Sequence, residues 1–294
     1  MKRRDFLKFL MFSPVILRTG AWAEGQPELV VASGGGPEGL VRRAVEALGG
    51  MGKFVKRGDR VLVKPNMAWD RGPQYAANTN PRVVAEVVRL CLEAGAREVL
   101  VLDNSCEDQR RVYKRSGIAE AAQAAGAKVP FVDPRRFRKV RIGGKVLKEW
   151  EVYREALEVD RIVNVPVLKH HSLARLTMGM KNLMGLIGGR RAQLHWQLGE
   201  ALADLAAFFR PQLVVLDATK VLTKGGPQGG NLKFVKAMGM VVVGSDQVAV
   251  DAMGARLFGL EPEEISYVAA AHRRGLGEMD LRKLRIKRVR CEGA

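Results

Sequence analysis

Along most of the chain, short apolar runs alternate with segments in which apolar residues recur at a helical spacing. Runs rich in Val and Leu are typical of buried strands, whereas the helical spacing predicts amphipathic helices that pack against them. Strands that alternate with helices indicate an α/β fold with a mainly parallel sheet flanked by helices. The predicted strands are residues 29–33, 60–64, 98–102, 128–132, 161–165, 213–216, 240–243 and 284–289, and the predicted helices are residues 37–48, 81–94, 117–125, 199–209, 246–258 and 262–273.

Residues 137–153 follow a different pattern, in which charged and apolar residues alternate around Gly143-Gly144. Alternation with a period of two around a pair of glycines predicts a small inserted β-hairpin. Elsewhere the sequence has neither an internal repeat nor a low-complexity linker that would divide it. We therefore expect residues 24–294 to form a single α/β domain that carries this hairpin.

The first residues contain the three parts of an export signal in the expected order. Arg3-Arg4-x-Phe6-Leu7-Lys8 matches the twin-arginine pattern, an apolar stretch follows over residues 9–17, and Ala21-Trp22-Ala23 is a small-residue cleavage site. We expect residues 1–23 to be a signal peptide that engages the twin-arginine translocase. The mature chain would then begin at Glu24 and reside in the periplasm or at the extracytoplasmic face. No apolar run reaches about 18 residues, so we expect no transmembrane span in the mature protein.

The net charge of the chain at first suggests a polyanionic partner. The sequence has 49 Lys and Arg against 31 Asp and Glu, a formal net charge of +18, which loss of residues 1–23 would lower to +14. A basic chain is a reason to consider nucleic acid. Export would separate this protein from nucleic acid, however, and aromatic residues make up only 6% of the chain. We therefore expect no nucleic-acid partner. The hydrophobic fraction of 47% excludes a largely disordered chain.

The spacing of cysteine and histidine gives no metal signature. Cys91, Cys106 and Cys291 are far apart, so we expect no iron–sulfur cluster and no zinc set of cysteines. The sequence contains no His-x-x-x-His or His-x-Glu pattern either. A metal ion would need ligands from distant segments, and the sequence identifies neither a metal nor an organic cofactor.

One segment, residues 161–199, contains no Asp or Glu but holds three of the four histidines of the chain. Surface segments usually mix charges, so a segment of one sign concentrates positive potential and attracts an anion. Its glycines allow backbone amides to approach a ligand closely. The pattern predicts a site for a small carboxylate- or phosphate-bearing ligand; a basic loop resting on acidic residues elsewhere is the alternative. The basic residues of the segment are Arg161, Lys169, Arg175, Lys181, Arg190 and Arg191.

Within this segment, His195 is the main candidate for a general acid or base, or for a metal ligand. His170 and His171 are adjacent, so on an extended chain only one of them faces a site, and we take His170 as the second catalytic candidate. Lys169 is the third, because a desolvated lysine can act as a base. The remaining candidates of the segment are Lys181 and Arg190, which would hold an anion, and Asn182, which would orient a substrate oxygen.

Further candidates stand at the ends of predicted strands, where α/β sheets hold their ligands. Lys64 and Asn66 follow one strand, and Asp217 follows another. Asp246 follows a third strand and is expected to cap the next helix or to complete a metal site. Asp251 lies in an otherwise apolar helix face and must have a partner if it is buried.

Several short motifs follow one another along the chain: Lys64-Pro65-Asn66, Asn80-Pro81, Leu102-Asp103, Lys169-His170, residues 180–185, His195, residues 225–227 and residues 244–251. In this order they resemble the family called domain of unknown function 362, over about residues 28–290. The resemblance implies an α/β fold, and the family name assigns no activity. Many relatives carry added ferredoxin-like cysteine runs, which this chain lacks. At the level of fold alone, the chain is similar to the cofactor-binding part of lactate racemases, in which histidines and lysines surround an anionic nickel–pincer cofactor. A shared fold does not imply a shared function.

Three functions are compatible with these observations. The first is an exported enzyme that acts on a small anionic substrate, or uses an anionic cofactor, through histidine and lysine acid–base chemistry. The second is a non-catalytic ligand-binding protein or cofactor carrier of the cell envelope with the same pocket. The third is an interaction protein whose basic surface binds acidic lipids or cell-wall polymers. The sequence alone does not decide between catalysis and binding.

Overall fold

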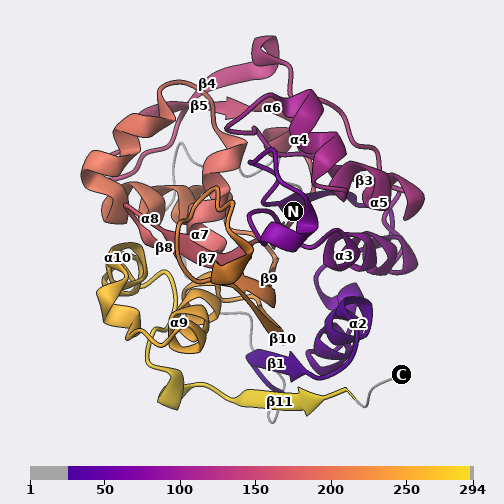
Figure 1. Ribbon diagram of the computed structural model, residues 1–294. Coiled ribbons are helices and arrows are strands. Elements are labelled where there is room, and N and C mark those ends of the chain that lie inside the picture. The colour runs from indigo at the N-terminus through magenta and orange to yellow at the C-terminus, as the bar shows by residue number, and fades with distance from the viewer. Residues whose placement is uncertain (1–25, 292–294) are drawn as a thin grey trace.

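The computed structural model describes residues 26–291, so the predicted signal peptide at residues 1–23 lies outside the described residues. Within this range, nine strands form one mixed sheet in the order β11-β1-β10-β9-β6-β2-β3, and β7 pairs with both β9 and β8 (Figure 1). Most of the strand pairs are parallel. The strands are β1 (Leu29–Ser33), β2 (Arg60–Pro65), β3 (Glu98–Val101), β6 (Arg161–Val165), β7 (Val167–His171), β8 (Arg175–Thr177), β9 (Leu213–Leu222), β10 (Val235–Gly244) and β11 (Ile286–Arg290).

Helices cover both faces of this sheet; Figure 1 shows α2 and α3 on one side and α8, α9 and α10 on the other. Side chains alternate along each strand, so that Val30 and Ala32 of β1 join one apolar core while Leu29 and Val31 join the other. Burial on both faces explains why the strands are continuous apolar runs in the sequence. The predicted α/β fold is confirmed. The helices are α2 (Pro37–Ala47), α3 (Pro81–Glu93), α4 (Gln109–Arg115), α5 (Ile118–Ala124), α6 (Arg154–Glu158), α7 (Gly179–Asn182), α8 (Leu198–Phe209), α9 (Gln247–Phe258) and α10 (Ser266–Arg273).

The small hairpin is also confirmed. β4 (Phe137–Arg141) pairs with β5 (Glu149–Tyr153) in a separate antiparallel sheet. Asp204 of α8 fixes the turn between them, because its carboxylate accepts hydrogen bonds of 2.8 Å from three successive amides at residues 145–147. The insertion is thereby attached to the main body of the fold.

Three strand predictions differ from the structure. Residues 128–132 form no strand; Lys128 makes an isolated bridge to Leu100, and Pro130, two residues later, has no amide to continue a ladder. The predicted strands at 213–216 and 240–243 are the first part of β9 and the last part of β10, which extend further as an antiparallel pair. β9 stays buried except at Lys220, but Asp217 and Thr219 interrupt its apolar run. Residues 235–239 of β10 are at least partly exposed, so the apolar pattern begins only after that strand has started.

The direction of β10 determines which predicted site residues can meet. β10 runs antiparallel to β9 and β1, whereas β9, β6, β2 and β3 run parallel to one another. Gly244, at the carboxyl end of β10, lies beside Val214 near the start of β9. The carboxyl end of β10 therefore lies beside the amino ends of the parallel strands, on the side of the sheet opposite to the carboxyl ends of β2 and β3. No helix within residues 26–291 has both the length and the apolar character needed to cross a membrane.

Candidate functional site

An open cavity of about 720 Å³ lies at the carboxyl ends of β2 and β3. Its wall also includes residues of β7, β8 and α7, and of the short 3-10 helices η4 (Leu183–Leu186) and η5 (Arg191–Gln197). Because three lysines from distant segments line it, we name it the lysine cavity. The structure brings seven of the predicted site residues together there: Lys64, Asn66, Lys169, Lys181, Asn182, Arg190 and His195.

Lys64, near the end of β2, is fully paired inside the protein. Its Nζ lies 2.8 Å from Oδ1 of Asp103 and donates to the carbonyl of Pro65 at 2.8 Å and to Oδ1 of Asn182 at 3.1 Å. Burial lowers the pKa of the Lys64 amine, and the charge of Asp103 partly opposes this. Gly185 packs against the pair, because a Cβ atom at that position would overlap both the Asp103 carboxylate and the Lys64 amine.

Lys169, in β7, is only 1% exposed and lacks a carboxylate partner among the described residues. Its Nζ donates to Oδ1 of Asn66 at 3.2 Å and to the carbonyl of Ala77. The ring centroid of Trp69 lies 5.9 Å from the same nitrogen. Burial, with a further contribution from the charge of Lys181, lowers the pKa of the Lys169 amine to about 7. A substantial fraction of this lysine is therefore neutral near neutral pH.

Lys181, in α7, has the least satisfied amine of the three. Within the described part of the chain, its Nζ makes one hydrogen-bond contact, to the thioether Sδ of Met184 at 3.0 Å. A thioether is a weak acceptor, so this partly exposed ammonium group can still take an oxygen acceptor from the cavity. Burial, together with the charges of Arg191 and Lys64, lowers the pKa of the Lys181 amine to about 8.

The side chains of two asparagines, Asn66 and Asn182, connect Lys64 and Lys169 through hydrogen bonds. Asn182 accepts at Oδ1 from Lys64 and from Nδ2 of Asn66, at 3.1 and 3.2 Å, and its Nδ2 donates to Oδ1 of Asn164 at 2.8 Å. Asn66 in turn accepts from Lys169. The amides therefore fix the positions of the amines. Asn182 uses both ends of its side chain within the protein, which supports a positioning role.

Two histidine rings at the cavity have complementary hydrogen-bonding states. Nδ1 of His171 accepts from the amides of Leu173 and Ala174 at 3.1 and 3.2 Å, so the proton of the neutral ring is on Nε2. Burial and neighbouring cations lower the pKa of His171 to about 3. Nδ1 of His195 lies 3.1 Å from the carbonyl of Ala192, which can only accept; its Nε2 therefore has a free lone pair. Burial also lowers the pKa of His195. The two rings stack with centroids 5.9 Å apart.

Asp251 supports the cavity from behind. The residue is fully buried, and its two oxygens accept from the amides of Gly179 and Met180 at 2.6 and 2.9 Å. These amides begin α7, which carries Lys181. The partner expected for a buried Asp251 is thus the start of this helix. Burial raises the pKa of Asp251 to about 7, although both hydrogen bonds lower it.

Two further predicted residues, His170 and Asp246, do not line the lysine cavity either. His170 points away from it, and its Nδ1 accepts from the amide of Gly226 at 3.2 Å, so it holds the Gly-rich loop while its neighbour His171 lines the cavity. Asp246 caps α9, as expected, by accepting from the amides of Val248 and Ala249 at 2.8 and 3.1 Å. It lies at the opposite edge of the sheet because β10 is antiparallel.

Sequence reasoning gave no role to Thr177, which also lines the cavity. Thr177 pairs with Lys169 across β7 and β8, and its Oγ1 is buried without a hydrogen-bond partner within the described residues. The exposed thiol of Cys106 lines the cavity as well. Thr177 was not predicted because the β7–β8 hairpin was not recognised in the sequence. Its two short strands follow directly after Pro166 and show no separate apolar pattern.

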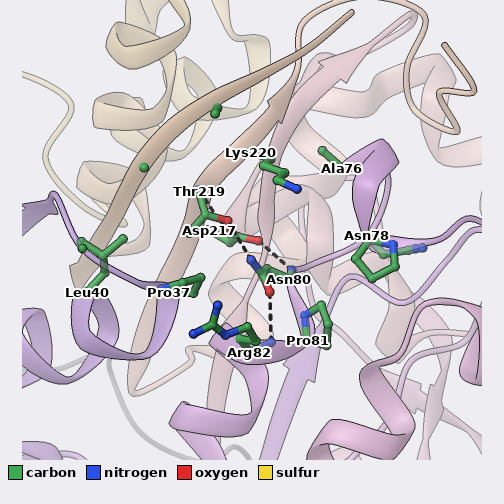
Figure 2. Close-up of a pocket in the computed structure, with 14 residues that line it drawn as sticks. Pro37, Leu40, Ala76, Asn78, Asn80, Pro81, Arg82, Asp217, Thr219 and Lys220 are labelled. Carbon is green, nitrogen blue, oxygen red and sulfur yellow. Dashed lines mark hydrogen bonds between the residues drawn. The ribbon is translucent and has the colours of Figure 1, made fainter. Parts of the chain in front are cut away.

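The last predicted residue, Asp217, lies in a second cavity of about 530 Å³ (Figure 2). Its carboxylate accepts from the amide of Asn80 at 2.7 Å and from the amide and hydroxyl of Thr219 at 2.9 and 2.6 Å. Asn80 also caps α3 by accepting from the amide of Arg82 at 3.0 Å. Burial raises the pKa of Asp217. We name this second cavity the Asp217 cavity.

Within residues 26–291, no three side chains of His, Cys, Asp or Glu come together in a way that would hold a metal ion. The titratable groups that do come together are mostly cationic. Lys64, Lys169, Lys181, Arg190 and Arg191 line the lysine cavity against one carboxylate, Asp103. This donor set suits an anion.

Comparisons with known proteins complete the description. A family model described as "Domain of unknown function (DUF362)" matches residues 61–256. The thylakoid-associated protein sll1697 of Synechocystis sp. is 33% identical over 250 residues, which cover 80% of this chain and 74% of that protein. Among solved structures, the lactate racemase apoprotein from Thermoanaerobacterium thermosaccharolyticum matches 81% of this chain with a TM-score of 0.46 and 12% identity. A protein from Thermotoga maritima matches 86% with a TM-score of 0.40 and 13% identity. This chain spans only 58% and 61% of those two chains.

Proposed function

The chain belongs to the family described as domain of unknown function (DUF362), and since that description assigns no activity, we propose a function from the chemistry of the lysine cavity. We propose that the cavity binds a small anionic ligand through a carboxylate or phosphate group. Lys169 and Lys181 would contact the anion, Arg190 would approach it from the exposed rim, and the two histidines would exchange a proton with it.

The charge balance of the cavity wall is the observation that supports this proposal most strongly. Five cations face one carboxylate, and that carboxylate is already paired with Lys64. Neither Lys169 nor Lys181 has an acidic partner among the described residues. Lys169 is almost fully buried, where charges are normally paired, whereas Lys181 is partly exposed at the cavity wall. An incoming anion would supply the missing partner and stabilise both ammonium groups.

The histidine pair makes acid–base catalysis the favoured use of this site. A neutral His171 with its proton on Nε2 can donate a hydrogen bond to a ligand oxygen, whereas the lone pair on Nε2 of His195 can accept a proton. A donor and an acceptor beside bound negative charge are the requirements for moving a proton on a substrate. We therefore favour an enzyme that acts on a small anion.

A ligand panel tests this proposal. Carboxylates and phosphoesters that bind should raise the melting temperature of the folded protein in a concentration-dependent way. His195→Ala should abolish turnover of any active member, whereas His272→Ala, which changes the fourth histidine outside the cavity, should not. If His195→Ala retained both ligand binding and turnover at full strength, the assigned role would be wrong.

A non-catalytic carrier is the alternative, because the same charge balance would hold a ligand without transforming it. Native mass spectrometry and elemental analysis of the protein from its own host distinguish the two. A ligand that co-purifies in stoichiometric amount and is never converted would favour the carrier. Turnover without a retained ligand would favour the enzyme.

The export signal is a separate part of this proposal and is supported by residues 1–23 of the sequence alone. We propose that these residues direct twin-arginine export and that residues 24–294 are the mature domain. Changing Arg3 and Arg4 together to lysine should keep the protein in the cytoplasm, while Lys2→Gln should not. N-terminal sequencing of the exported protein should begin at Glu24.

A further inference from the structure

One of the large apolar side chains that are exposed to solvent, Leu173, lines the lysine cavity. Within residues 26–291, four such side chains are strongly exposed: Leu173 (69%), Trp196 (83%), Leu232 (53%) and Phe131 (51%). Of these four, only Leu173 lines the cavity. Phe131 lies elsewhere and packs on the ring of Tyr113.

The cavity wall continues this apolar surface inward. Trp69, Ala68 and Met184 line the cavity together with the lysines, and the Trp69 ring lies within 5.9 Å of the Lys169 amine. The wall therefore combines cations with apolar side chains. Exposed apolar side chains that cluster at a binding site usually contribute to binding.

This arrangement identifies the class of ligand. We propose that the lysine cavity takes an amphiphilic anion, whose carboxylate or phosphate headgroup binds near Lys169 and Lys181 and whose aliphatic chain lies against Trp69, Met184 and Leu173. The proposal rests on the function proposed above and narrows it, because a small anion without an apolar part would leave Leu173 and the apolar part of the wall uncovered.

The dependence of affinity on chain length tests the proposal. Straight-chain carboxylates of two to ten carbons, below their aggregation concentrations, are titrated into the protein as its own host produces it, by calorimetry at constant ionic strength. The affinity should rise about fourfold for each methylene that the protein covers, since burial of one methylene contributes about 0.8 kcal/mol. Neutral alcohols of the same lengths should bind at least tenfold more weakly, because they lack the charge that the lysines recognise.

Variants at the mouth locate the effect. Leu173→Ser should keep the affinity for the shortest carboxylate and lose part of the increase with chain length. Phe131→Ser removes an exposed side chain of similar kind outside the mouth and should behave like the unaltered protein. Far-ultraviolet circular dichroism of each variant confirms that it is folded.

The outcomes separate this inference from the proposed function. Equal affinity for all chain lengths, or an unchanged increase in Leu173→Ser, would overturn the amphiphile while leaving a small-anion site intact. If no anion of any length bound, the proposed function itself would fail. Binding that appears only above the aggregation concentration, or only on anionic vesicles, would assign the apolar mouth to a membrane surface and overturn the proposal as well.

Discussion

The two cavities of the molecule contain similar polar groups but use them differently. In the Asp217 cavity, the carboxylate accepts three hydrogen bonds from Asn80 and Thr219, and Arg82 at its edge is paired with Glu38 at 2.6 Å. In the lysine cavity, the amine of Lys181 contacts a thioether, and the buried hydroxyl of Thr177 has no partner within the described residues.

This difference indicates in which cavity a ligand would find polar groups that are not already paired within the protein. Buried polar groups in folded proteins are nearly always paired, so a group that is fully satisfied by its neighbours is explained by the fold alone. Asp217 is such a group, because it joins the start of α3 to β9. In the lysine cavity, the partly exposed amine of Lys181 contacts only a thioether among the described residues, so an anion bound there would supply a stronger partner.

Asp217→Ala has the largest expected effect and acts on stability. The substitution would leave the amides of Asn80 and Thr219 and the hydroxyl of Thr219 without their acceptor, at a cost of about 1–3 kcal/mol for each donor that stays buried. We expect a loss of about 3 kcal/mol in the free energy of unfolding, measured by urea denaturation. Lys220→Ala, at the next exposed position, should change it by less than about 0.5 kcal/mol.

The same pair of variants probes the assignment of the cavities. Anion affinity of folded Asp217→Ala should equal that of the unaltered protein. A large loss of affinity without a loss of stability would contradict a structural role for Asp217 and would transfer the ligand to the second cavity.

Lys181→Met has the next largest effect and acts on ligand binding. Methionine preserves the apolar contact with Met184 but removes the charge, so a charge-assisted hydrogen bond of about 1.5–3 kcal/mol to the anion would be lost. We expect a decrease in anion affinity of roughly 10- to 100-fold by calorimetry. Lys220→Met removes an exposed lysine from the Asp217 cavity and should leave the affinity within about threefold. Equal losses in both variants would show that overall charge, and not the cavity, attracts the ligand.

Much of this fold could be predicted because its strands are buried on both faces. Apolar runs such as residues 29–33 and 161–165 coincide with β1 and β6. The absence of acidic residues from 161 to 199 also located most of the lysine cavity, since unpaired cations tend to gather where an anion binds.

The missing information concerns strand direction and side-chain orientation. Asp246 follows a strand just as Asp217 does, but the sequence does not reveal that β10 is antiparallel, and direction decides at which edge each residue lies. Adjacent His170 and His171 were known to point to opposite sides, yet only the pairing of β7 with β8 shows that His171 lines the cavity. Folding also determines the partners of the two lysines. It places Asn66 and Ala77 beside the amine of Lys169, and Met184 beside the amine of Lys181.

The pH dependence of anion binding has the smallest expected effect and tests the neutral amines. Because the pKa values of Lys169 and Lys181 are lowered to about 7 and about 8, both amines are cationic below pH 7 and mostly neutral above pH 9. Anion affinity should therefore be highest below pH 7 and fall roughly tenfold between pH 7 and pH 9, because each lost ammonium removes attraction. A carboxylate that stays ionised throughout is the suitable probe, at constant ionic strength.

Stability of the free protein should follow the opposite trend. The pKa of Lys169 is lower in the folded protein than the ordinary lysine value of 10.5, so the unfolded chain binds more protons between about pH 7 and pH 10.5. The free energy of unfolding should therefore increase as the pH rises through this range. In Lys169→Met both trends should be flatter, while Lys236→Met, an exposed lysine of β10, should preserve them. Affinity that is constant from pH 6 to pH 9 would mean that the amines stay charged without a ligand, and the lysine cavity would then differ from the Asp217 cavity in charge but not in lacking partners.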